Sequence, residues 1–113
     1  AWPERMDTPC DPLDLAALGS LTFQAPDEVR FPATRLCREA AEAGGAAPAV
    51  LNAANEVAVA AFLSGQISFT RIADTVAHVL DSSNDAAPPR SLDDVIWLDR
   101  SARQRARSVL ETA

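Results

Sequence analysis

The chain has 113 residues, a formal net charge of −6 and a sequence pI of about 4.6. An acidic chain is poorly suited to neutralising phosphates, so we expect no nucleic-acid partner. All of its basic residues are arginines, and the absence of lysine excludes chemistry that needs a lysine amine. Hydrophobic residues make up 48% of the sequence, which is enough for one compact domain.

Residues 1–31 are interpreted as an extended, proline-rich arm. Prolines recur along this segment, and each disfavours helix at the residue before it. Residues 20–24 have the pattern of a short strand. The segment is acidic, so we expect it to run over another surface instead of packing on itself. Its apolar anchors are Leu13, Leu15, Leu18, Leu21 and Phe23.

Residues 32–113 have the apolar periodicity of a helical domain. The first predicted helix covers 32–43, and the second begins at Pro48 and ends at Gly65. A third begins at residue 68 or 69 and continues to about residue 80. Its apolar positions are Ile72, Val76, Val79 and Leu80, and its outward face is Arg71, Asp74, Thr75 and His78.

The rest of this domain is predicted to hold a mobile loop and a further helical region. Residues 81–90 contain two prolines and no apolar anchor. A capping box at 91–94 predicts one or two turns ending near Leu98, and Asp99 is expected to cap a last helix at 100–112. The predicted fold is all-α: an antiparallel four-helix bundle-like domain preceded by the extended arm.

The main candidate site is a set of three polar side chains in the second predicted helix. Residues 48–63 are apolar on every side except at Asn52, Asn55 and Glu56, which predicts a buried helix with these three in one sector. Buried polar groups need partners, so we interpret them as a structural cluster that crosslinks the arm or a loop. A small-ligand or cation site is the alternative, although hard cations usually take more oxygen ligands.

The remaining polar and aromatic residues are given structural interpretations. Arg100, Arg103 and Arg107 share one helix face, interpreted as a solvated surface that pairs with acids of the arm; a phosphate or acidic-lipid patch is the alternative. Trp2 and Trp97 are interpreted as packing anchors.

Metal, export and membrane signals are absent from the sequence. Cys10, Cys37 and the single His78 lack zinc-ligand spacing, and His78 is interpreted as a surface or packing residue. With no export leader and no apolar run of about 18 residues, we expect a cytoplasmic protein without membrane insertion. Because the chain begins Ala-Trp-Pro without methionine, it has the character of a piece of a longer polypeptide, although removal of a short leader would look the same.

A series of short segments carries a family resemblance. In chain order they include Ala1-Trp2-Pro3-Glu4-Arg5, Leu21-Thr22-Phe23, Arg30-Phe31-Pro32, Ala43-Gly44-Gly45 and Leu51-Asn52-Ala53-Ala54-Asn55-Glu56-Val57. Together they closely resemble the C-terminal part of the 1-deoxy-D-xylulose 5-phosphate reductoisomerases. The resemblance covers essentially the whole chain, and the last of these segments is its most specific part.

The resemblance implies a parent enzyme of three parts: an NADPH-binding domain, a catalytic domain that holds a divalent cation (Mg or Mn), and a C-terminal helical domain on an extended linker. Such enzymes convert 1-deoxy-D-xylulose 5-phosphate to 2-C-methyl-D-erythritol 4-phosphate in the non-mevalonate route to isoprenoids. The parent is expected to be a homodimer.

Within that scheme, this chain is the linker and the helical domain. It is a structural part whose partners are the other two domains, and it is inactive alone. The resemblance implies no catalytic, cofactor-binding or metal residue here. The alternative is a free-standing helical interaction module that binds a partner through the Asn52, Asn55 and Glu56 sector or through the arginine face.

Overall fold

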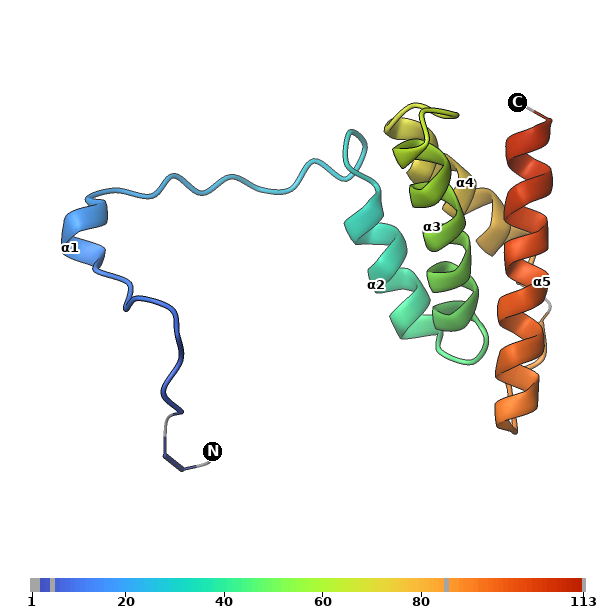
Figure 1. Ribbon diagram of the computed structural model, residues 1–113, viewed down its shortest axis with the longest axis horizontal. Coiled ribbons are helices and arrows are strands. Elements are labelled where there is room, and N and C mark those ends of the chain that lie inside the picture. The colour runs from blue at the N-terminus through green and yellow to red at the C-terminus, as the bar shows by residue number, and fades with distance from the viewer. Residues whose placement is uncertain (1–2, 5, 85, 113) are drawn as a thin grey trace.

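A computed structural model describes residues 3–4, 6–84 and 86–112 of the chain; Trp2 lies outside this part. The described residues form five α-helices and no strand. They are α1 (Leu15–Leu18), α2 (Ala33–Ala43), α3 (Ala47–Leu63), α4 (Thr70–Asp81) and α5 (Leu92–Glu111). From α2 to α5 successive helices alternate in direction (Figure 1). The predicted all-α, bundle-like fold class is confirmed.

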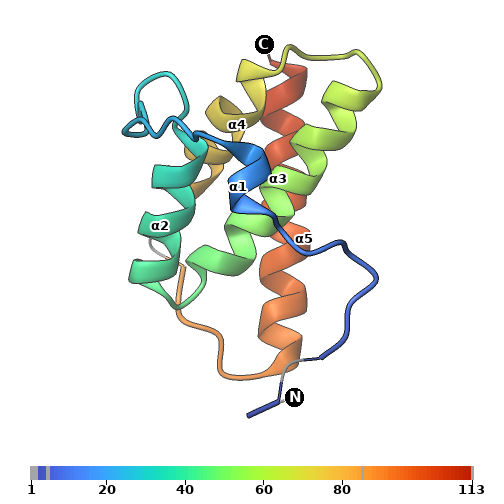
Figure 2. The ribbon, with the colours of Figure 1, turned by 90° about the vertical axis from the view of Figure 1, so that its left-hand side faces the viewer.

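Helix α3 is the centre of the bundle, because it packs against α2, α4 and α5 (Figures 1 and 2). Its buried side consists mainly of alanines, among them Ala53, Ala54 and Ala58, each fully buried. Since alanine ends at Cβ, the neighbouring helices approach α3 closely. The core residues supplied by the other helices are Leu36 and Ala40 of α2, Val76 and Val79 of α4, and Leu98, Ala102 and Ala106 of α5.

The turn between α2 and α3 depends on glycine. Gly44 and Gly45 have φ angles of +64° and +55°, a region that side chains with a Cβ rarely adopt. The Gly44 N–H donates to the carbonyl oxygen of Ala40, which completes the last turn of α2. The glycine stop expected here is therefore confirmed.

Helix α5 is continuous, so the predicted break near Leu98 is wrong. Its start is as expected: the Ser91 hydroxyl accepts from the Asp94 N–H at 3.2 Å, and the Asp94 carboxylate accepts from the Ser91 N–H at 3.0 Å. Asp99 does not cap a second helix; its carboxylate instead accepts from Arg103. The stripe Leu98, Ala102 and Ala106 continues without interruption at a spacing of four residues, so the helix has no reason to end.

The connection between α4 and α5 contains anchors, contrary to the prediction. Ser83 is buried, donates its hydroxyl to the Val79 carbonyl oxygen at 2.7 Å and accepts from Arg105 Nη1 at 2.6 Å. Ala86 packs against the core.

Thr75, expected on the outward face of α4, is instead fully buried. Its hydroxyl donates to the Arg71 carbonyl oxygen at 2.7 Å.

The described residues before α2 do not form a hydrophobic core of their own, because every residue from 6 to 31 is exposed. Figure 1 shows this segment running away from the helices. No strand forms at residues 20–24; the segment contains α1 instead. Asp14 accepts from the N–H groups of Ala16 and Ala17, and Asp27 accepts from those of Val29 and Arg30.

The division into an arm at 1–31 and a domain at 32–113 stays a prediction. Trp97, interpreted as a packing anchor, is 62% exposed, so it is not packed among the described residues of this chain. Among the described residues, no helix combines the length and the apolar character needed to cross a membrane.

Candidate functional site

The polar residues of α3 lie on its exposed side, so the predicted burial of this helix on all sides is wrong. Asn52, Asn55 and Glu56 are all exposed. The physical reason is that three neighbouring helices cover only the alanine-rich part of the α3 surface. The three residues share one sector, as expected from a rotation of about 100° per residue.

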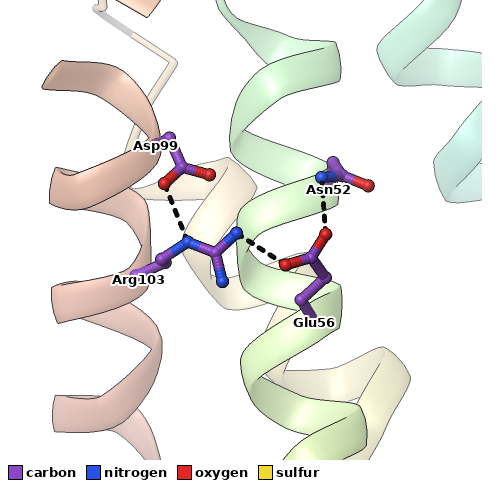
Figure 3. A network of polar contacts seen from close by, with 4 residues as sticks. All are labelled: Asn52, Glu56, Asp99 and Arg103. Atoms are coloured by element: carbon purple, nitrogen blue, oxygen red, sulfur yellow. Dashed lines mark hydrogen bonds and ion pairs between the residues drawn. The ribbon is translucent and has the colours of Figure 1, made fainter. Parts of the chain in front are cut away.

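Two of these residues join a network that links α3 to α5, shown in Figure 3. Glu56 Oε2 accepts from Arg103 Nη2 at 2.6 Å, and Glu56 Oε1 accepts from Asn52 Nδ2 at 3.2 Å. Arg103 Nε donates to Asp99 Oδ2 at 2.8 Å. We call Asn52, Glu56, Asp99 and Arg103 the α3–α5 network. Among the described hydrogen bonds, none involves the Asn55 side chain.

The guanidinium of Arg103 stabilises the charged forms of both carboxylates in the network. The pKa of Glu56 lies below its usual value mainly because Glu56 accepts a hydrogen bond from Arg103, and secondly because it accepts one from Asn52. The hydrogen bond from Arg103 likewise lowers the pKa of Asp99, and the two carboxylates together raise the pKa of Arg103. One cation therefore lies between two anions at neutral pH. The Glu56 side chain is 54% exposed, so solvent weakens this attraction.

The arginine face is only partly a solvated surface. Arg103 pairs with acids of α3 and α5, not with the arm as predicted. The Asp99–Arg103 pair has the i, i+4 spacing that is visible in a sequence, and this spacing is the signal for the pair. The pair Glu56–Arg103 spans 47 positions and depends on how two helices pack, so spacing alone does not reveal it.

A groove of about 630 Å³ lies beside the network, between α3 and the C-terminal half of α5. Its lining mixes apolar and charged groups: Glu56, Val57, Ala60, Ala61, Ser64, Gln66, Arg103, Arg107, Leu110 and Glu111. In the part of the chain that the structure describes, no group of three or more His, Cys, Asp or Glu side chains could hold a metal ion. Of the two carboxylates in this lining, Glu56 is already engaged by Arg103.

Comparison with known proteins identifies the family. Residues 1–105 match the family model described as the DXP reductoisomerase C-terminal domain. The chain belongs to this family. The 1-deoxy-D-xylulose 5-phosphate reductoisomerase of Pseudomonas putida is 56% identical over 110 residues, which are 97% of this chain and 27% of that protein. The resemblance drawn from the sequence is thus confirmed, including the position at the C-terminal part of such enzymes.

Solved structures agree over the same extent. The reductoisomerase from Zymomonas mobilis in complex with NADPH is 49% identical with a TM-score of 0.88, over 100% of this chain and 30% of that one. A DOX-P reductoisomerase in complex with magnesium is 37% identical with a TM-score of 0.86, over 98% of this chain and 30% of that one. The chain therefore spans less than a third of the length of these relatives.

Proposed function

We propose that this chain is the C-terminal structural domain of an NADPH-dependent 1-deoxy-D-xylulose 5-phosphate reductoisomerase, and that it does not catalyse alone. The parent would be an oxidoreductase of the non-mevalonate isoprenoid pathway that forms 2-C-methyl-D-erythritol 4-phosphate. The observation that carries the proposal is the family match over residues 1–105, combined with coverage of only 27% of a relative that is 56% identical.

The chemistry of the chain supports a structural role. It has no lysine to bind a substrate phosphate, and its described residues contain no cluster of metal ligands. The related structures contain NADPH and magnesium. We propose that NADPH and the divalent cation, Mg or Mn, bind to the parts of the longer protein that precede Ala1.

The partners follow from the same proposal. They are the NADPH-binding and catalytic domains of the parent chain, which would be a cytoplasmic homodimer. Exposed apolar side chains before α2, such as Phe23 at 85% and Val29 at 91%, support a segment that packs on another body of protein. In this proposal the cluster of polar residues is structural and not catalytic. Its members are Asn52, Asn55 and Glu56.

The test is a chimera in which this chain replaces the matching C-terminal region of the Pseudomonas putida enzyme. We expect the chimera to oxidise NADPH with 1-deoxy-D-xylulose 5-phosphate and Mg²⁺, and we expect no turnover from the 113-residue chain alone. The matched control is the Pseudomonas enzyme truncated before this region. Turnover by the isolated chain, or a chimera no more active than the truncated enzyme, would contradict the proposal.

The alternative is a free-standing helical interaction module, which the exposed apolar segment before α2 also suits. The two candidates differ in what the gene encodes upstream of Ala1. A strand, a glycine-rich turn and an acidic metal site there would support the reductoisomerase. Their absence would support the module.

A further inference from the structure

One side of α3 is exposed and nearly free of charge. Its exposed positions fall within an arc of about 140° at 3.6 residues per turn. They are Pro48, Asn52, Asn55, Glu56, Ala60 and Leu63, and we call them the α3 face. No other helix crosses in front of α3 in Figure 1. Glu56 is the single charged residue of α3, and it pairs with Arg103.

The contrast with α2 shows that this composition is local. Helix α2 exposes Arg38, Glu39 and Glu42, as is usual for a surface in contact with water. On the α3 face, Leu63 is instead 77% exposed. An apolar side chain of this size gains free energy when another surface removes it from water.

The two asparagines give the α3 face polar groups suited to a protein backbone. In Figure 3 the Asn52 nitrogen points to Glu56, whereas its carbonyl oxygen points away and offers an acceptor. Asn55 adds a carboxamide with both a donor and an acceptor. The hydrogen bond to Glu56 favours this orientation of the Asn52 carboxamide, which leaves the acceptor available to a partner.

We infer that the α3 face is the surface on which the preceding part of the parent chain docks, and that this partner presents an uncharged, partly apolar surface with accessible backbone groups. The inference rests on the proposed function and adds to it the face that is used. The chain covers 27–30% of its relatives, so most of such a protein lies outside the structure. The described residues of the arm are themselves exposed and do not cover this face.

The test measures how fast a thiol at position 63 reacts with a maleimide. Cys10 and Cys37 are first replaced by serine, and Leu63→Cys is then introduced into both the 113-residue chain and the Pseudomonas chimera. Leu92→Cys is the matched control, because Leu92 is 74% exposed at the start of α5. We expect labelling at position 63 to be at least about tenfold slower in the chimera, as for a group that reacts only when a contact opens. Labelling at position 92 should be similar in both proteins.

Three outcomes would overturn the inference. They are equal labelling rates at position 63 in the two proteins, equal slowing at positions 63 and 92, and protection of position 63 in the isolated chain that grows with its concentration. The last would assign the α3 face to a second copy of the chain. Turnover by the chimera is measured separately, so an active chimera with an unprotected position 63 rejects the docking face while leaving the proposed function intact.

Discussion

Replacement of Val79 by alanine tests the packing of the core. Val79 lies on α4, is fully buried and belongs to the core cluster around α3. The substitution removes two methyl groups, whose transfer from water is worth about 1.6 kcal/mol at about 0.8 kcal/mol per carbon. The unfilled space adds up to about 1 kcal/mol. We therefore expect unfolding to need about 2–2.5 kcal/mol less free energy.

Thermal and urea unfolding of the 113-residue chain, followed by circular dichroism, measure this loss. For a domain of this size, about 2 kcal/mol corresponds to a fall of roughly 8–16 °C in melting temperature. Val29→Ala is the matched control, since the same two methyl groups are removed at a position that is 91% exposed. Equal melting temperatures for the two variants would refute the assignment of Val79 to the core.

Three further substitutions test the α3–α5 network and the start of α5. Arg103→Met should lower the melting temperature by more than Arg107→Met, because it leaves the carboxylates of Glu56 and Asp99 without their cation. The pKa of Glu56 is lower in the folded state than in the unfolded state, whose pKa is about 4.3. Ionised Glu56 therefore stabilises the fold above about pH 4.3, and this stabilisation is lost as the pH falls through the pKa of the folded state. Glu56→Gln should therefore flatten the loss of thermal stability on acidification. Ser91→Ala removes the cap of α5 and should cost about 1 kcal/mol in urea unfolding.

Each of these predictions has a control within the chain. Glu42→Gln changes an exposed acid of α2 and should not alter how the melting temperature falls on acidification. If Glu56→Gln also leaves this fall unchanged, the result would contradict the ion pair between Glu56 and Arg103. Ser108→Ala removes a hydroxyl from the interior of α5, where it caps no helix. If Ser91→Ala and Ser108→Ala unfold alike, the capping box does not stabilise α5.

The sequence revealed those parts of the fold that depend on local spacing. The recurrence of Val76 and Val79 on one side of α4 and the glycine stop at Gly44 are patterns within a few residues. The Ser91 capping box is equally local. Each such signal lies within about one turn of helix, so it can be recognised without knowing which elements pack against that helix.

Features that depend on long-range packing were not predicted. Ser83 is anchored by Arg105, 22 positions away, and the sequence around Ser83 resembles an ordinary polar loop. Glu56 meets Arg103 only because α3 lies beside α5.

Alanine is a second cause of error in predicting burial from sequence. Ala58 is buried and Ala60 is exposed on the same helix, yet their hydropathy is identical. A helix rich in alanine therefore looks buried on every side when it is not.

The aspartate turns before α2 have a consequence for assembly. Asp14 and Asp27 each bond two nearby backbone N–H groups within the next three residues, with no contribution from distant parts of the chain. Such turns exist before the segment meets a partner, so fewer backbone conformations are given up on contact. A segment with this built-in order loses less entropy when it becomes fixed, which favours tighter attachment for the same buried area.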